Sequence, residues 1–186
     1  MTNTVFEKAA EQLVDIAKRF GAALESAGIP YRVIGGLATF LHVDRVDPIA
    51  ARMTRDVDVA IDRDRLDSIR AAVEPLGFKY RHVAGVDMFL DASSPRARSA
   101  VRAAFVGEKV RPEYLEPVPA SEPVSTKEGI LIAPVADLVR MKLTSFRLKD
   151  KVHIQDLDSV GLITPEIQAG LSEPLLARLK EVRATE

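Results

Sequence analysis

The sequence contains no cysteine, which excludes disulfides and thiolate metal ligands and favours an intracellular protein. Aromatic residues make up only 5% of the chain, too few to predict platforms on which single-stranded bases stack. The formal net charge of -1 argues against the broad basic field of a general nucleic-acid binder. No apolar run approaches the ~20 residues of a membrane span, and the N-terminus lacks the features of a signal peptide. We therefore expect a soluble, cytoplasmic protein that does not enter a membrane.

The chain of 186 residues, 47% of them hydrophobic, is long enough for one sizeable core and a small appended element. Periodicity and turn residues predict an α+β class, with a mixed β-sheet flanked by helices. We place this core in residues 1–133 and a small helical part in residues 134–186. The expected helices cover residues 4–27, 37–43, 63–77 and 135–151, followed by two short ones in the tail, separated at Gly161 and Pro165. The expected strands cover residues 31–34, 56–62, 78–91, 97–110 and 130–134, with a bulge at Gly85 and a long polar loop at 111–129.

Gly35 and Gly36 lie between the strand "YRVI" and the apolar helix "LATFLHV". Glycine at a strand-to-helix turn can adopt positive φ and has no side chain to keep a ligand away from the backbone. The free N–H groups and the positive end of the following helix favour an anion such as phosphate. A glycine pair alone is more often an ordinary turn, so its context has to decide.

Asp56 and Asp58 lie in the next predicted strand, "DVDVAID". Residues two apart on a strand point to the same face, so the two carboxylates should converge. A divalent cation would relieve their repulsion, and a set of oxygen ligands favours Mg²⁺ or Mn²⁺ over zinc. The alternative is a solvated strand face, but the order of glycine pair, helix and acid pair favours a site for a metal and a nucleoside triphosphate.

These motifs resemble the nucleotidyltransferase superfamily that includes DNA polymerase β, whose signature is a glycine pair followed by an acid pair on the next strand. "VIGGLATFLH" and "TRDVDVAID" carry this resemblance, and "LVRMKLTSFRLKDKVHIQDL" is similar to the corresponding helix of the AbiEii-type group. That group comprises toxins of toxin–antitoxin and phage-defence pairs. The resemblance covers residues 28–162. It implies transfer of a nucleotidyl group from a nucleoside triphosphate to an acceptor such as RNA or a protein, and a cognate antitoxin as a partner.

The resemblance also implies a role for each matching residue. Gly35 and Gly36 would hold the triphosphate, and Asp56 and Asp58 would bind magnesium and serve catalysis. Lys142 would face the phosphates and Asp156 would help to frame the site. Lys142 lies in an apolar helical run, where it is either buried against an anion or extended to the surface. Arg52 and Arg55 flank the acids and could neutralise phosphate, although surface arginines are commoner.

One position departs from the family pattern. Arg102 in "VRAAFVGE" stands where the family has a third carboxylate, which there helps to bind metal and acts as general base. Arginine can do neither. Asp87, Asp91 or Glu108 could substitute, although each is more simply explained as a solvated acid at a strand end.

Two hypotheses follow for the function. The first is a magnesium-dependent nucleotidyltransferase, whose best local basic patch for an RNA acceptor comprises Arg96, Arg98 and Arg102. The second is a catalytically degenerate binding or regulatory module that retains the fold and works through a partner, with the long polar loop as one docking element. Arg102 favours the module, but two intact motifs outweigh one missing residue, so the sequence predicts the enzyme first.

Overall fold

Helices and strands alternate as far as Val83, further strands follow as far as Ile132, and only helices come after that. The computed structural model describes residues 3–93 and 100–185, with side chains for 8–93 and 100–185. The strands are β1 (Tyr31–Ile34), β2 (Val57–Ile61), β3 (Phe78–Val83), β4 (Val86–Asp91), β5 (Ala100–Phe105), β6 (Val124–Ser125) and β7 (Leu131–Ile132). The helices are α1 (Asn3–Ser26), α2 (Gly35–Asp44), α3 (Leu66–Val73), α4 (Val135–Ser145), α5 (Leu148–Ser159), α6 (Pro165–Ala169) and α7 (Glu173–Arg183), with 3₁₀ turns at Arg63–Arg65 and Glu74–Leu76.

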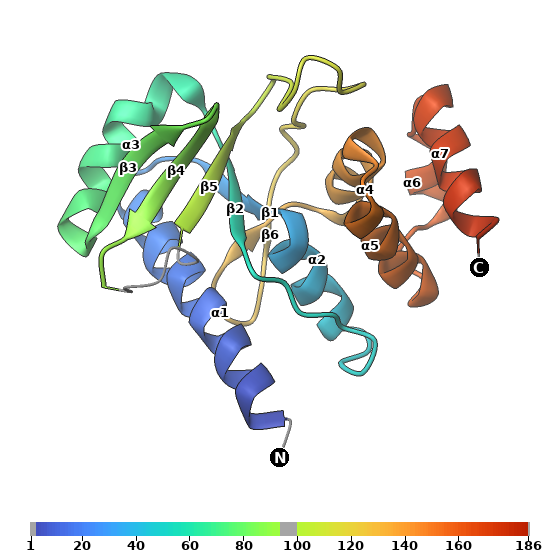
Figure 1. The fold of residues 1–186 in the computed structure, drawn as a ribbon, viewed down its shortest axis with the longest axis horizontal. Coiled ribbons are helices and arrows are strands. Elements are labelled where there is room, and N and C mark those ends of the chain that lie inside the picture. The colour runs from blue at the N-terminus through green and yellow to red at the C-terminus, as the bar shows by residue number, and fades with distance from the viewer. Residues whose placement is uncertain (1–2, 94–99, 186) are drawn as a thin grey trace.

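The strands form one sheet in the order β3-β4-β5-β2-β1-β7-β6 (Figure 1). Strand β1 runs antiparallel to β2 and parallel to β7, while β2 runs parallel to β5. The predicted α+β class with a mixed sheet flanked by helices is therefore confirmed. This order places the start of β2 beside both the end of β1 and the start of β5, so the two predicted motifs and Arg102 meet at one edge of the sheet.

The main core is formed by the sheet with helices α1, α2 and α3. In α1, apolar residues recur at helical spacing and are buried, including Leu13, Phe20 and Leu24. The Phe20 ring lies 5.4 Å from Phe78 and 5.1 Å from Phe89 between ring centroids, which ties α1 to β3 and β4. This packing holds in place the sheet that carries Asp58 and Arg102.

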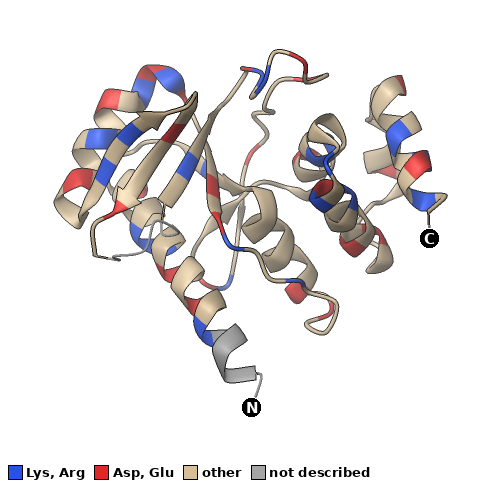
Figure 2. Ribbon diagram, in the orientation of Figure 1, with Lys and Arg blue, Asp and Glu red and all other residues tan. Residues whose placement is uncertain are grey.

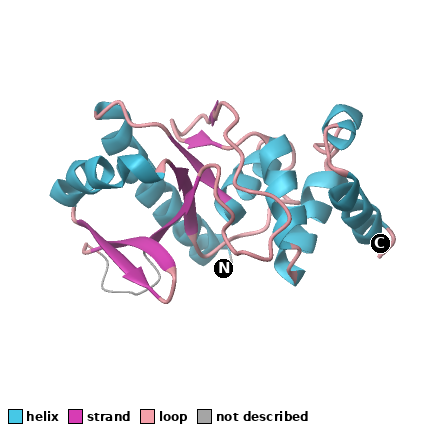
Figure 3. Ribbon diagram, turned by 90° about the horizontal axis from the view of Figure 1, so that it is seen from above, coloured by secondary structure: helices cyan, strands magenta, loops and turns pink. Residues whose placement is uncertain are grey.

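Helices α4 to α7 gather at the end of the molecule farthest from β3 and β4 (Figures 1 and 3). They share a second apolar cluster that includes Val139, Leu143, Ile154 and Leu179. Helix α2 joins the two clusters, because Leu37 belongs to the first and Val43 to the second. The division into residues 1–133 and 134–186 stays a prediction.

The predicted single helix over residues 135–151 is wrong. Helix α4 ends at Ser145, Phe146 takes a left-handed conformation with φ of 51°, and α5 begins at Leu148. Asp150 accepts a hydrogen bond from the backbone N–H of Arg147 and so caps the new helix. Helix α5 therefore includes residues that we had assigned to the tail, and the tail helices are α6 and α7.

The predicted strand over residues 78–91 is also wrong, because it is a hairpin of β3 and β4. Ala84 and Gly85 both have positive φ, at 51° and 75°, and form the two-residue turn. Consecutive positive φ values are typical of a tight hairpin turn, so Gly85 marks a chain reversal and not a bulge. The long loop also contains the short strand β6.

Most helices carry both basic and acidic residues, in line with the near-zero net charge (Figure 2). The basic patch that we predicted includes Arg96 and Arg98, which lie outside the described residues. Within the described ranges, no helix combines the length and the apolar character that crossing a membrane would require.

Candidate nucleotide-binding pocket

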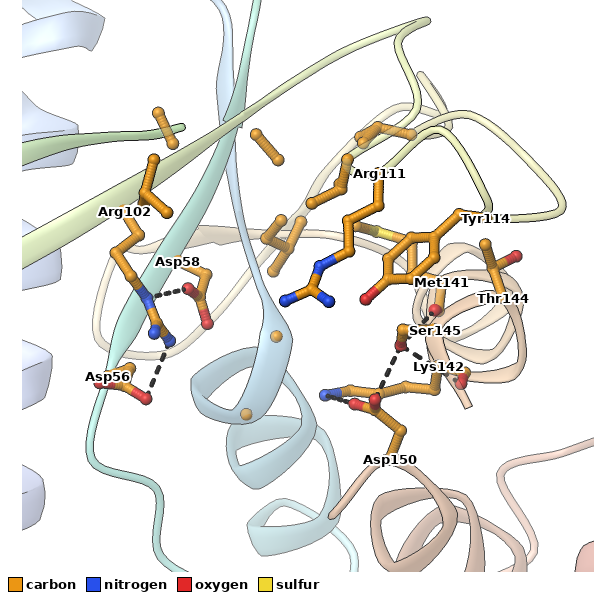
Figure 4. A pocket seen from close by; sticks show the side chains of 18 of the residues that line it. Asp56, Asp58, Arg102, Arg111, Tyr114, Met141, Lys142, Thr144, Ser145 and Asp150 are labelled. Atoms are coloured by element: carbon orange, nitrogen blue, oxygen red, sulfur yellow. Dashed lines mark hydrogen bonds and ion pairs between the residues drawn. The ribbon is translucent and has the colours of Figure 1, made fainter. Parts of the chain in front are cut away.

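A pocket of about 860 Å³ lies where the sheet edge meets α4, α5 and the loop after β5 (Figure 4). Among the described residues that line it, eight are Lys or Arg and six are Asp or Glu. Six predicted site residues belong to its wall: Gly35, Gly36, Arg55, Asp56, Asp58 and Lys142. The chain therefore brings together residues that lie more than 100 positions apart in sequence.

The two glycines begin helix α2 at this wall. Gly35 has φ of 70°, and a Cβ atom there would lie 2.4 Å from Oδ2 of Asp58. A Cβ on Gly36 would lie 2.4 Å from Oγ1 of Thr54. The glycines are thus required by the close approach of β2 and the segment before it, whether or not a ligand is bound. No side chain in the described part of the chain caps the helix, so its first N–H groups remain open to an anion.

Asp56 and Asp58 converge as predicted, but on an arginine. Nη2 of Arg102 lies 2.8 Å from Oδ2 of Asp56, and Nε lies 2.8 Å from Oδ1 of Asp58 (Figure 4). Burial would lower the pKa of Arg102, but the charges of Asp58 and Asp56 and their hydrogen bonds raise it above its ordinary value. The guanidinium therefore holds its charge between the two carboxylates.

The acids that we considered as substitutes for a third carboxylate all have other partners. Asp91 pairs with Arg19 and does not belong to the pocket wall. Asp87 accepts hydrogen bonds from Tyr80 and pairs with His82 at 2.9 Å. Glu108 binds Arg63 through both oxygens, at 2.6 and 2.7 Å, which keeps its pKa below the ordinary value.

Lys142 is buried, as the first of our two interpretations expects. Its Nζ lies 3.2 Å from Oδ1 of Asp150, which is fully buried and also accepts hydrogen bonds from Ser145 and Arg147 (Figure 4). Burial would raise the pKa of Asp150, but these donors and the charge of Lys142 lower it to about 2. Burial lowers the pKa of Lys142, and the charges of Asp150 and Asp58 offset part of that effect. The anion beside Lys142 is thus supplied by the protein.

His153 on α5 also lines the pocket, and its Nδ1 is buried without a hydrogen-bond partner among the described residues. Burial, with the charge of Lys142 as the second cause, lowers the pKa of His153 to about 4.

We expect the imidazole resonances of His153 to titrate near pH 4 by NMR, and near neutrality once His153 is released by unfolding. Between these two pKa values the unfolded chain binds a proton that the folded chain does not. The free energy of unfolding should therefore fall as the pH is lowered from about 6.5 to 4. A midpoint near 6.5 in the folded protein would contradict this environment, and Lys142→Met should raise the midpoint.

Two residues of the long loop were not singled out by sequence reasoning. Arg111 and Tyr114 extend from this loop into the pocket, opposite α4 (Figure 4). Within the described part of the chain, the one ion pair of Arg111 is a long one with Glu113, at 3.9 Å, and its guanidinium lies 6.0 Å from the centroid of the Tyr114 ring. The unusual length of the loop was the one signal that could have drawn attention to them.

Asp156 is not part of the described pocket wall. Its Oδ1 lies 2.8 Å from Nε of Arg52, while its Oδ2 is buried and has no partner among the described residues. Burial raises the pKa of Asp156, and Arg52 offsets part of that effect. Of the two arginines that flank the acid pair, Arg52 therefore pairs with α5, and Arg55 is the one that faces the pocket.

The sequence matches no protein-family model and none of the curated proteins. The fold, however, matches several solved structures. A nucleotidyltransferase-like antigenic protein from Paracoccidioides brasiliensis aligns with 96% of this chain and 90% of its own, at a TM-score of 0.62 and 20% identity. The antibiotic-resistance factor ANT(2'')-Ia, crystallised with adenylyl-2''-tobramycin, aligns with 92% of this chain and 97% of its own, at a TM-score of 0.55 and 13% identity. Its solution structure gives a TM-score of 0.50. The fold is that of the nucleotidyltransferases.

At these identities the likeness shows the nucleotidyltransferase fold alone. The AbiEii-type resemblance, the toxin role and the antitoxin partner stay predictions. The metal that the fold family implies is not accommodated by the observed arrangement, because the facing oxygens of Asp56 and Asp58 are bound by Arg102. Over residues 8–93 and 100–185, no cluster of three or more Asp, Glu or His side chains is arranged to hold an ion.

Proposed function

We propose that this chain binds a nucleoside triphosphate in the pocket between the sheet edge, α4 and α5. The observation that carries the proposal is that the uncapped N-terminus of α2 lies in a pocket wall rich in Lys and Arg. Gly35 and Gly36 add no side chain to the first turn of α2, and that turn has no acidic residue of its own, although Oδ2 of Asp58 lies beside Gly35. A phosphate at this point would meet open N–H groups and the positive end of the helix dipole.

The charges around the pocket suit a polyphosphate. Arg55, Arg111 and Lys149 line it together with Arg102, Lys142 and Arg147, which pair with carboxylates of the chain. Among the described residues, Arg111 has only Glu113 as a carboxylate partner, at 3.9 Å, so its guanidinium can bind a phosphate oxygen through two N–H groups.

The size and apolar lining of the pocket suit a nucleoside. Its volume of about 860 Å³ lies within the range of small-molecule sites. The ring of Tyr114 and the side chain of Met141 offer an apolar surface at the end near α4 (Figure 4). We expect the base to stack there, while the phosphates lie towards the glycines and Arg111.

The geometry favours a binding or regulatory module over a transferase. Transfer would need a general base for the acceptor hydroxyl, and the described acids of the pocket wall are all held in ion pairs or hydrogen bonds. Nucleotidyl transfer with Mg²⁺ or Mn²⁺ to RNA, a protein or a small molecule is the second candidate. It is favoured by the convergence of Asp56 and Asp58, and by a neighbour of the same fold that was crystallised with an adenylylated aminoglycoside. A labelled nucleotide that reaches an acceptor in cell extract only when Asp58 is present would establish it.

Calorimetric titration of each nucleoside triphosphate tests the proposed binding. We expect the wild type to bind at least one of them, and Arg111→Ala to weaken that binding about tenfold or more through loss of charge-assisted hydrogen bonds. Arg65→Ala is the matched control, since Arg65 is equally basic and exposed but does not line the pocket. The absence of binding for every nucleotide, or an equal loss in both variants, would contradict the proposal.

A further inference from the structure

Arg102 occupies the space between the two carboxylates that a divalent ion would need. Its guanidinium reaches Asp56 through Nη2 and Asp58 through Nε, each at 2.8 Å. Planar N–H groups at these distances each satisfy one oxygen of a carboxylate. A metal could bind the pair in this arrangement only by displacing a guanidinium that already offsets one of their two charges.

The register of the sheet fixes this arrangement. Strands β2 and β5 run parallel with Asp58 directly opposite Arg102, and Val57 and Val59 opposite Val101 and Ala103. Residues opposite each other share a face of the sheet, so the acid and the arginine must point the same way. Apolar side chains of the same strands are buried on the other face, and a slip by one residue would bury Arg102 in the core. The contact is therefore built into the fold and is not an accident of flexible side chains.

The side chain of Arg102 is also well supported in its position. It is 35% exposed, compared with 41% for Asp56 and 25% for Asp58, so the pair-forming atoms are partly shielded from water. The other neighbour of Arg102 across the sheet is Met88 on β4, which offers no competing charge. Partial burial strengthens the ion pairs relative to exposed ones.

We propose that Arg102 takes the place of the divalent cation, so that this pocket binds its nucleotide without metal. The inference rests on the proposed function for the identity of the ligand. Arg102 offsets one of the two carboxylate charges, and the positive charge that a metal would supply to the phosphates comes from Arg111 on the facing side of the pocket (Figure 4). Asp56 and Asp58 then serve to orient Arg102, and they do not act as metal ligands.

A titration with Mn²⁺ alone, followed by electron paramagnetic resonance, tests the metal part without any nucleotide. We expect no site tighter than about 1 mM in the wild type. Arg102→Asp should create a third carboxylate beside Asp56 and Asp58 and so produce a saturable Mn²⁺ site. Adding Asp58→Asn to that variant should remove the site again. A wild-type Mn²⁺ site that is lost in Asp58→Asn would overturn the inference, and this outcome does not depend on whether Arg102→Asp folds.

Calorimetry of the nucleotide in EDTA and in magnesium chloride completes the test. We expect the wild type to bind with the same dissociation constant in both buffers, and Arg102→Met to weaken binding in both. Binding that requires magnesium would overturn the inference while leaving the proposed function intact. Failure to bind in either buffer would instead contradict the proposed function, and the Mn²⁺ titration would still decide whether Arg102 replaces the metal.

Discussion

Asp150→Asn is expected to lower the free energy of unfolding by about 3–5 kcal/mol, because it leaves Lys142 charged and buried without a carboxylate. Asp150 is fully buried and receives Lys142, Arg147 and Ser145 at once. The substitution keeps the shape of the side chain, so the loss reports charge and not packing. Urea denaturation at pH 7, followed by circular dichroism, would measure the effect.

Two further variants sharpen this result. Lys142→Met should cost less than Asp150→Asn, because Asp150 keeps its bonds to Arg147 and Ser145. Glu181→Gln removes an exposed ion pair with Lys151 and should cost less than about 1 kcal/mol. If Asp150→Asn cost no more than Glu181→Gln, the buried pair would not be a structural element of the pocket.

The same pair predicts how stability depends on pH. The pKa of Asp150 is about 2 in the folded protein, below the ordinary value of 3.8. A carboxyl group with a depressed pKa contributes stability that is present above about pH 4 and is lost as the pH falls towards 2. The difference between the wild type and Asp150→Asn should therefore shrink as the pH is lowered through that window.

Gly35→Ala is expected to destabilise the protein by about 2–4 kcal/mol. Part of the loss comes from φ of 70°, which an L-residue adopts only with strain, and part from the contact of the new Cβ with Asp58. Because that contact would push Asp58 away from Arg102, nucleotide binding should fall together with stability. Thermal unfolding and calorimetry on one preparation would measure both.

Gly28→Ala is the matched control for Gly35→Ala. Gly28 has φ of 66°, but a Cβ there would have no neighbour within 4 Å. It should therefore show the conformational cost of about 1–2 kcal/mol alone, with nucleotide binding unchanged. Equal losses in the two variants would show that Asp58 moves freely, and that its ion pair with Arg102 is not fixed by the backbone.

The sequence determined much of the scaffold because its signals are local. Alternation of acid and apolar residues predicted the strand that carries Asp58, and helical spacing of Leu13, Phe20 and Leu24 predicted α1. The order of glycine pair, helix and acid pair predicted that these residues form one site. The mixed α+β fold followed from these elements and from the family resemblance.

Local patterns failed where a conformation depends on a partner far away in the chain. The break at Phe146 separates α4 from α5 and brings Asp150 to Lys142, but the run around it is helical in pattern. The hairpin at Gly85 required two consecutive positive φ values, and one of them belongs to Ala84, which carries no turn signal.

Only the tertiary structure decided the state of the site. The sequence showed that Arg102 replaces an expected acid, but the pairing of β2 with β5 joins residues 44 positions apart and sets that arginine between Asp56 and Asp58. The tertiary structure likewise places the carboxylate of Asp150 beside Lys142 and brings Arg111 from a long loop to the pocket. Such contacts follow from strand register and helix packing, which depend on the whole core. They therefore cannot be predicted from any short segment of the sequence.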